Sequence, residues 1–435
     1  MNMFQLNENG TTVKRELFAG LTTFLTMAYV IIVNPIILAD AGVPIDQVFM
    51  ATIIAAVIGT GWMALCANYP IAVAPGMGLN AYFTYTVVLA SNGEITYLTA
   101  FSAVFVAGLI FVLISLTPFR EKLITAIPEN LKLAITAGIG LFIAFIGLRM
   151  SGIVVANDSN LVGLGNIAEP ATFLTIIGLF VTVALMARNV NGAIFIGMIV
   201  TAIIAMLTGQ LTIEKVVAMP HLPEGILVFN PIDAIREVIE YGLYGVVFSF
   251  ILVTLFDTTG TMIGVAKQAG LMKNGKLPRA RKALISDSLA TTIGAMFGTS
   301  PSTAYLESGS GVAVGGRTGL TSLTVAVLFI IASFFGPLVS SLSGVAAITS
   351  PALIIVGSLM IGVVKNIKWD DIEDAFPAFL VILTMPLTSS ISTGIALGFI
   401  SYPLVMIFKG RARDVHPLVY IFALLFVLQL VYMPH

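Results

Sequence analysis

The sequence predicts an all-α polytopic membrane protein with about fourteen transmembrane segments, and three observations carry that prediction. The 435 residues are 58% hydrophobic and only 10% charged, whereas about 25% of the residues of a soluble protein are charged. Apolar segments long enough to cross a hydrocarbon core recur along the whole chain. Short motifs of the first half also return in the second half at nearly one offset, which indicates an internal duplication.

The expected spans fall into two sets of seven, separated by a polar stretch. They are 17–39, 47–67, 71–90, 95–118, 130–149, 170–187 and 192–209, followed by 241–266, 283–298, 300–316, 319–341, 345–364, 373–390 and 392–408. A further apolar piece, His416–Met433, is either a fifteenth span or a helix lying on the membrane surface. The chain therefore divides into a first repeat (1–209), an extracellular linker (210–240), a second repeat (241–410) and a C-terminal hydrophobic segment (411–435).

Three motif pairs support the duplication. The first span opens with Glu16-Leu-Phe-Ala-Gly and the eighth with Glu240-Tyr-Gly-Leu-Tyr, Pro70 corresponds to Pro301, and Pro128 corresponds to Pro351. Because seven spans is an odd number, the two copies must face opposite ways in the membrane. Inverted repeats are typical of transporters, whose site lies between the copies at mid-depth; channels can share the arrangement.

The distribution of Lys and Arg predicts the orientation. If the N-terminus is cytoplasmic, eighteen basic residues fall on the cytoplasmic side, including Lys122 and a cluster from Lys267 to Lys282. Only three, Arg149, Lys215 and Arg236, fall on the other side. This positive-inside bias predicts a multi-pass protein of the cytoplasmic membrane, embedded in its lipid bilayer, with a cytoplasmic N-terminus.

Asp257 and Glu307 are isolated acids in long apolar stretches. Each is the only charged residue of its stretch and lies ten positions before a basic residue, Lys267 or Arg317. Ten helical residues span about 15 Å, half of a hydrocarbon core of about 30 Å. If the basic residues mark the membrane surface, both carboxyl groups lie near mid-depth, where an ionised carboxylate is costly unless it is paired or hydrated. Both are therefore predicted to belong to a functional site.

The third and tenth spans are unusual for transmembrane helices. Pro70, Pro75, Gly76 and Gly78 interrupt the third span, because proline removes a backbone donor and glycine destabilises a helix. Residues 70–75 are thus expected to be extended, with a helix beginning near Gly76–Gly78. The tenth span is expected to repeat this pattern, with an extended piece over 299–303 and a helix over 305–314. Simple kinks for packing are the alternative, but irregular backbone at depth is tolerated where it lines a cavity.

The side chains near these breaks suggest a pocket for a flat heterocycle. Asn80 offers an amide donor and acceptor, while Asp257 and Glu307 accept hydrogen bonds when ionised. Free amides at two half-helix N-termini, at Gly76–Gly78 and at Ala304, Tyr305 and Leu306, are expected to add donors. Two neighbouring carboxyl groups at low dielectric do not both ionise readily, so one of them is expected to carry a proton. Tyr305 can also stack on a ring, although an aromatic side chain more often serves packing.

Other chemistries receive little support. The single cysteine, Cys66, excludes an intrachain disulfide, and His221, His416 and His435 show no metal-ligand spacing, so no metal or cofactor is expected. No phosphate-binding GxxxxGK[ST] motif or catalytic set is found, so the protein is not expected to be an enzyme. A net charge of -1 without a basic patch gives no reason to expect nucleic acid. Asp287, near Lys282, is expected to form an ion pair rather than to serve transport.

At these residues the chain resembles the AzgA-like purine permeases of the nucleobase/ascorbate transporter superfamily. The matching stretches run from Gly20 to Tyr29 with Asn34-Pro35, from Ala74 to Tyr82, from Phe256 to Thr261 and from Ser302 to Gly311. The likeness extends from near residue 4 to past residue 410.

The resemblance implies a seven-plus-seven inverted repeat. A core domain (17–118 and 241–341) would move against a gate domain (128–209 and 345–408) in elevator-type alternating access. The resemblance also implies proton-coupled uptake of a purine base held by Asp257 and Glu307, with Asn80 lining the site. Guanine or hypoxanthine is favoured over adenine, and an anion carrier or channel on the same fold is the other alternative. Proton or sodium coupling, the preferred purine and homodimer formation stay open.

Overall fold

The computed structural model describes residues 2–117, 120, 126–272 and 277–432. Lys122, Lys273 and Lys276, which contribute to the predicted orientation, lie outside these residues, as does the end of the C-terminal segment. Within the described ranges, nine continuous helical stretches, some of them made of two or more of the elements given below, are at least 18 residues long and apolar enough to cross a membrane. Two shorter apolar helices, Ala193–Leu207 and Pro417–Val431, add to them.

The elements of the first half follow the predicted spans. They are α1 (Val13–Met27), α2 (Val30–Asp40), α3 (Ile45–Trp62), β1 (Val73–Pro75), α4 (Met77–Ala81), α5 (Tyr97–Leu116), α7 (Glu129–Met150), α8 (Pro170–Ala187) and α9 (Ala193–Leu207). Short helical segments complete the half: η1 (Asn2–Phe4), η2 (Met63–Ala67), η3 (Tyr82–Val88) and η4 (Leu89–Ser91). Of these, η2 extends α3, and the π-helical η3 continues α4 without a break.

The second half repeats the order of the first. Its elements are α11 (Tyr244–Gln268), α12 (Ala280–Phe297), β4 (Ser302–Ala304), α13 (Ser308–Ala313), α14 (Gly319–Ala332), η5 (Ser333–Phe335), α15 (Gly336–Ser343), α16 (Ala346–Ile361), η6 (Gly362–Asn366), α17 (Ile372–Leu387) and α18 (Ile391–Phe408). In both halves the third segment is a strand followed by a helix, as the prolines and glycines predict.

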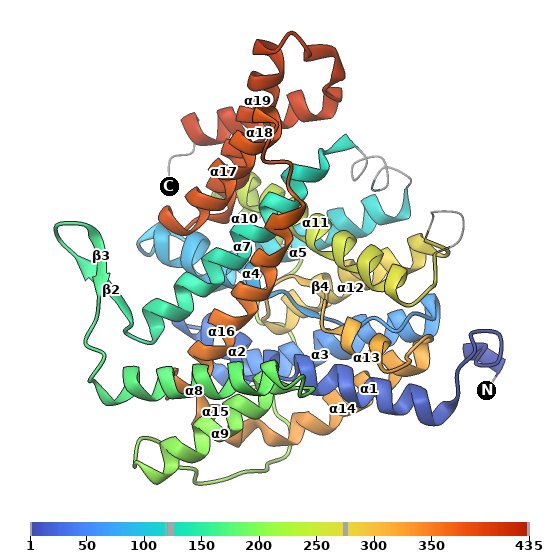
Figure 1. Ribbon diagram of the computed structural model, residues 1–435, viewed down its shortest axis with the longest axis vertical. Helices are drawn as coiled ribbons and strands as arrows, with labels where there is room; N and C mark the ends of the chain where they lie inside the picture. Colours follow the sequence, from blue (N-terminus) through green and yellow to red (C-terminus); the bar gives the residue numbers. More distant parts are fainter. Residues whose placement is uncertain (1, 118–119, 121–125, 273–276, 433–435) are drawn as a thin grey trace.

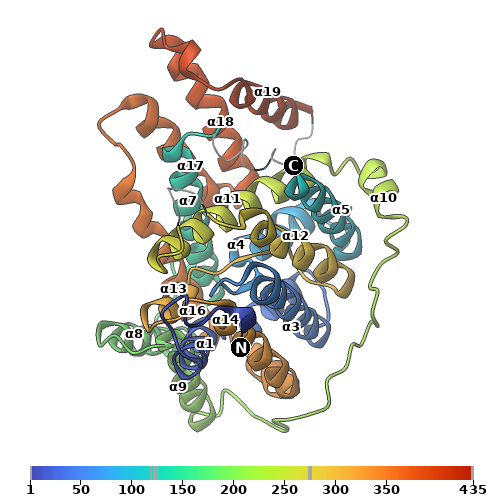
Figure 2. The same cartoon turned by 90° about the vertical axis from the view of Figure 1, so that its right-hand side faces the viewer.

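Several local features differ from the sequence prediction. The first span is two helices, because Ala28 and Tyr29 interrupt it. Residues 210–240 are not purely a linker, because their last part forms helix α10 (Ala234–Glu240). The preceding residues run along the outside of the molecule, as Figure 2 shows at its right-hand side. A hairpin of β2 (Val154–Asn157) and β3 (Leu161–Leu164) follows α7 and projects away from the helices (Figure 1).

The helices pack in two groups. In the first group α1 packs on α14, α3 packs on α12 and α14, and α5 packs on α12. In the second group α7 packs on α16 and α17, α8 packs on α9 and α16, and α17 packs on α18. Each group thus combines helices from both halves of the chain, which Figure 1 shows for blue α1 beside orange α14 and for teal α7 beside orange-red α16.

The C-terminal apolar segment forms helix α19 (Pro417–Tyr432), after the short η7 (Ala412–Asp414). It packs on α18 of the second group. The rings of Phe422 and Phe426 also lie 5.4 and 5.3 Å from the ring of Phe248 on α11, which is the first span of the second repeat. The helix therefore contacts both α11 and α18.

Two buried carboxylates fix helices to one another. Glu16 of α1 is fully buried and accepts hydrogen bonds from the backbone amides of Arg317, Thr318 and Thr321, at 2.8, 3.2 and 3.2 Å, at the start of α14. Asp287 of α12 forms the expected ion pair, but its partner is Arg120 at 2.8 Å and not the nearby Lys282. Arg120 is 1% exposed and Asp287 0%, so this pair is shielded from water.

Candidate functional site

The two broken spans meet as a short antiparallel β-ladder in the interior. Val73 pairs with Ala304, Ala74 with Thr303 and Pro75 with Ser302. Beyond the ladder, the Gly76 amide donates to the Pro301 carbonyl at 2.9 Å and the Tyr305 amide donates to the Ala72 carbonyl at 2.9 Å. Non-helical backbone in a bilayer must find partners within the protein. Each half of the chain here supplies the partners that the other half lacks.

A helix follows each strand. In the third segment α4 begins at Met77, close to the predicted start, and continues through η3. In the tenth segment α13 begins only at Ser308, not at Tyr305 as predicted, because Tyr305, Leu306 and Glu307 form a turn whose carbonyls accept the first amides of the helix. Glu307 therefore sits at the entrance of α13.

A cavity of about 420 Å³ lies beside the ladder, a volume within the range of small-molecule sites. One side is formed by α1, α4, α11 and the β4–α13 segment, and the other side by α8, α9, the loop between them and α16. The lining residues are Thr26, Tyr29, Met77, Gly78, Met186, Asn189, Val190, Asn191, Gly192, Ala193, Ile194, Asp257, Thr261, Thr303, Ala304, Tyr305, Leu306, Glu307, Ser310, Val356, Leu359 and Met360. The cavity thus lies between the two helix groups.

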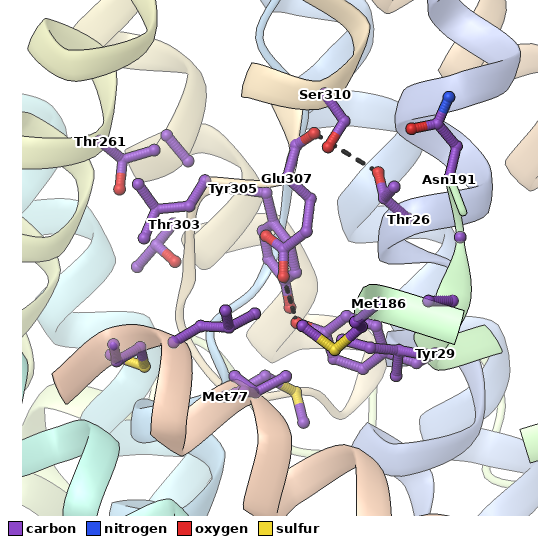
Figure 3. A pocket seen from close by; sticks show the side chains of 18 of the residues that line it. Thr26, Tyr29, Met77, Met186, Asn191, Thr261, Thr303, Tyr305, Glu307 and Ser310 are labelled. Atoms are coloured by element: carbon purple, nitrogen blue, oxygen red, sulfur yellow. Dashed lines mark hydrogen bonds between the residues drawn. The ribbon is translucent and has the colours of Figure 1, made fainter. Parts of the chain in front are cut away.

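Both predicted acids line this cavity. Asp257 comes from α11, with the Thr303 hydroxyl beside it, and Glu307 comes from the turn before α13. The Tyr29 hydroxyl donates a hydrogen bond of 2.6 Å to Glu307 Oε1, and Figure 3 shows the two side chains pointing toward each other. The Thr26 hydroxyl donates to the Glu307 carbonyl at 3.4 Å. Both acids are half-buried and line the cavity.

The structure separates the other predicted site residues into two sets. Gly78, Ala304, Tyr305 and Leu306 line the cavity, and Gly76 and Asn80 do not. The Gly76 amide is used by Pro301, as described above. The Ala304 amide donates to Thr258 Oγ1 at 3.3 Å and the Tyr305 amide to Ala72, so of those three predicted amide donors only that of Leu306 is left for a ligand.

Asn80 is fully buried behind the cavity wall. Its amide group donates to Asn34 Oδ1 at 2.9 Å, and Asn34 in turn donates to the hydroxyls of Thr52 and Thr299 at 2.8 and 2.9 Å. This network joins α2, α3 and α4 to the end of α12. In this arrangement Asn80 supports the wall of the cavity instead of lining it.

Sequence reasoning missed several lining residues. Tyr29 and Thr26 come from the first span and fall within the stretch from Gly20 to Tyr29 that carries the family resemblance, but no local feature marked them as site residues. Asn189 and Asn191 lie in the α8–α9 loop, and Val356 lies on α16. These last positions depend on how distant helices pack, which local sequence does not encode.

The charge character of the cavity is distinctive. Among the described residues that line it, two carry carboxyl groups and none is Lys, Arg or His. Amide and hydroxyl groups of Asn189, Asn191 and Thr261 supply neutral donors and acceptors. Such a cavity favours ligands that present N–H donors or positive charge, and it disfavours anions.

Comparisons with known proteins identify the family to which the chain belongs. Residues 14–397 match the model of the Permease family, Xan_ur_permease. The chain is 66% identical to the guanine/hypoxanthine permease PbuO of Bacillus subtilis (strain 168), over 98% of this chain and 99% of that protein. It is 42% identical to the adenine permease AdeP of Escherichia coli (strain K12), over 99% of this chain and 95% of that protein.

A solved structure shares the fold. The transmembrane domain of the cyanobacterium bicarbonate transporter BicA matches with a TM-score of 0.63 and 17% identity, covering 87% of this chain and 97% of that one. This agreement confirms the predicted seven-plus-seven inverted repeat of an all-α membrane protein. Together with the match of most of its length to the family model, it shows that the chain is an integral membrane protein belonging to the Permease family.

Proposed function

We propose that this protein imports purine nucleobases by symport with protons, with guanine and hypoxanthine as the favoured substrates. The observation that carries the proposal is the presence of two carboxyl groups, Asp257 and Glu307, in one cavity between two helix groups. Guanine and hypoxanthine present ring N–H donors to a carboxylate, and guanine adds an amino group. The amides and hydroxyls of the cavity supply donors for their ring nitrogen and carbonyl acceptors.

Proton coupling follows from the same two acids. Carboxyl groups that share a low-dielectric cavity disfavour simultaneous ionisation, so a proton can accompany the substrate on one of them. Glu307 accepts from the substrate, and Asp257 or Glu307 holds the proton. The substrate leaves chemically unchanged, because the role of the site is binding and release rather than catalysis.

The movement is of the elevator type. The core domain (17–118 and 241–341) carries the β-ladder and both acids, and the gate domain (128–209 and 345–408) supplies the opposite wall. The cavity meets the α8–α9 loop, where Asn189 and Asn191 are exposed. With a cytoplasmic N-terminus in the cytoplasmic membrane, that loop lies on the cytoplasmic side, so this conformation faces inward.

Contacts between core and gate at the opposite side fit this assignment. The Tyr85 hydroxyl donates to Asp40, also of the core domain, at 2.6 Å, and it lies 3.9 Å from the sulfur of Met150 on α7 of the gate domain. The Thr86 hydroxyl donates to the Ser389 carbonyl, between α17 and α18, at 2.7 Å. These contacts close the extracellular approach to the cavity.

Two alternatives have specific support. The adenine permease AdeP is also similar, but at 42% identity compared with 66% for the guanine/hypoxanthine permease PbuO. The likeness to BicA raises an anion carrier on the same fold. The absence of Lys, Arg and His from the described cavity lining disfavours an anion as the substrate.

The decisive experiment is uptake by the purified protein in liposomes with a proton gradient, acidic outside. We expect radiolabelled hypoxanthine to accumulate, guanine to compete more strongly than adenine, and a protonophore to abolish accumulation. Stronger competition by adenine would assign the adenine alternative, and accumulation that depends on Na⁺ and not on the proton gradient would refute proton symport. Uptake of bicarbonate without uptake of any purine would refute the proposal as a whole.

A further inference from the structure

Tyr29 is a buried phenol at the break between α1 and α2. Helix α1 ends at Met27 and α2 begins at Val30, so Tyr29 lies in the interruption itself. Its side chain is 1% exposed, and its hydroxyl donates to Glu307 Oε1 at 2.6 Å. Hydrogen bonds to an ionised acceptor are shorter and about twice as strong as neutral ones, so this bond favours the carboxylate form of Glu307.

The contact between α1 and α13 fixes this geometry. One turn before Tyr29, the Thr26 hydroxyl donates to the carbonyl of Glu307 at 3.4 Å. At Gly311, one turn after Glu307, an added Cβ would meet Thr23 Oγ1 at 2.1 Å and the Ala19 carbonyl at 2.6 Å. The two helices therefore approach closely beside this hydrogen bond, which leaves α13 little room to move relative to α1.

The groups that face Glu307 are few. Asp257 comes from α11, Tyr305 follows β4, and Tyr29 comes from the α1–α2 break. The other described lining residues, from α4, α8, α9, their connecting loop and α16, are uncharged. Tyr305 does not hold the carboxyl group, since its hydroxyl donates to the Pro75 carbonyl. Tyr29 is therefore the side chain through which the first span acts on Glu307.

We propose that Tyr29 is a positioning residue for Glu307. It occupies Oε1 and holds the carboxylate in one rotamer, and it leaves Oε2 available to an N–H donor of the substrate. This inference rests on the proposed role of Glu307 in purine binding, and it adds that the first span, through one hydroxyl group, sets the pH range in which the site binds.

The test is Tyr29→Phe, which removes the hydroxyl and keeps the ring. We expect wild-type expression and thermal stability, about a tenfold higher KM for hypoxanthine and a nearly unchanged Vmax. The rise of KM at low pH should begin about one pH unit higher than in the wild type, the shift that loss of one hydrogen bond to a charged group produces. Replacing Tyr29 with 3-fluorotyrosine, a stronger donor, should move the profile the opposite way, and this second variant retains the hydroxyl should Tyr29→Phe fail to fold.

Tyr69→Phe is the matched control. Tyr69 is equally buried and its hydroxyl also bonds to an oxygen, the Pro278 carbonyl, but it lies outside the cavity lining. Its variant should leave KM and its pH profile unchanged. In a Glu307→Gln background, Tyr29→Phe should add little to the loss of affinity, because the carboxylate that Tyr29 positions for the substrate is already gone.

The outcomes separate this inference from the proposed function. If the wild-type protein neither binds nor transports a purine, the proposed function fails. If the wild type transports but Tyr29→Phe leaves KM unchanged at every pH, the positioning role is refuted. A fall in Vmax and thermal stability with an unmoved pH profile would refute it as well, because that pattern marks a purely structural tyrosine.

Discussion

Replacing Glu307 with glutamine isolates the contribution of its charge. Glutamine has nearly the same shape, and its side-chain carbonyl can still accept the hydrogen bond that Tyr29 donates at 2.6 Å. The contact with the protein is therefore kept. On the substrate side, an NH2 donor replaces an oxygen acceptor and faces the N–H donors of the purine.

The structure sets the size of the expected effect. A hydrogen bond to an ionised group is worth about 1.5–3 kcal/mol, and each 1.4 kcal/mol corresponds to a factor of ten in affinity. Since at least one such bond is lost, the dissociation constant for hypoxanthine should rise about 10- to 100-fold. Uptake against a gradient should also disappear, because one of the two groups able to exchange a proton is gone.

The assay combines direct binding and transport. Hypoxanthine affinity is measured calorimetrically on purified protein, and initial uptake is measured in cells lacking purine transport, both normalised to protein in the membrane. Glu129→Gln is the matched control, because Glu129 is exposed at the start of α7 and, among the described residues, forms its ion pair with Lys132 at 3.0 Å. A dissociation constant within twofold of the wild type, together with intact accumulation, would refute the assignment of Glu307 to the site.

Three further substitutions test the surroundings of the site. Gly78→Ala places a Cβ 2.4 Å from Ile139 Cγ2 on α7. Because overpacking at this contact strains both helices, initial uptake should fall at least tenfold. Adding Ile139→Ala should restore uptake, and a double variant without recovery would show that this clash is not the cause. Asp287→Asn leaves the buried Arg120 unpaired and should destabilise the fold by about 3–5 kcal/mol; an unchanged melting temperature in detergent would contradict this. Glu16→Ala removes three backbone hydrogen bonds at the start of α14 and should cost about 2–3 kcal/mol, while purine affinity of the folded fraction stays at the wild-type value; a loss of affinity without a loss of stability would contradict the capping role.

Local sequence predicted the parts of the fold that depend on local physics. Pro70, Pro75 and Pro301 mark the broken spans, because a missing amide donor interrupts a helix wherever the chain lies. Asp257 and Glu307 could be recognised for a similar reason, since an unpaired acid is costly at any position in the bilayer core. The predicted extent of each span also agrees with the observed helices to within a few residues, because runs of apolar residues bounded by polar loops mark the spans in the local sequence.

Features that depend on distant packing were not predictable. The interruption at Ala28 and Tyr29 contains no helix breaker, and the nearest one, Pro35, lies a turn and a half further on. Asn80 carried the chemistry of a binding residue, but its position relative to the cavity depends on Asn34, from another helix. Helix α13 begins at Ser308 and not at Tyr305 as predicted, because the turn that holds Glu307 contacts α1 and β1.

The ladder between β1 and β4 has a consequence for biosynthesis. Residues 73–75 leave the ribosome more than two hundred residues before their partners at 302–304. Until then, the polar backbone of the first half has no strand to pair with inside a lipid environment that offers no water. The nascent first half must therefore wait near the membrane interface or within the insertion machinery, and neither half expressed alone should reach a stable structure. Co-expression of the two halves as separate chains, joined only by this pairing and by helix packing, should restore a folded protein.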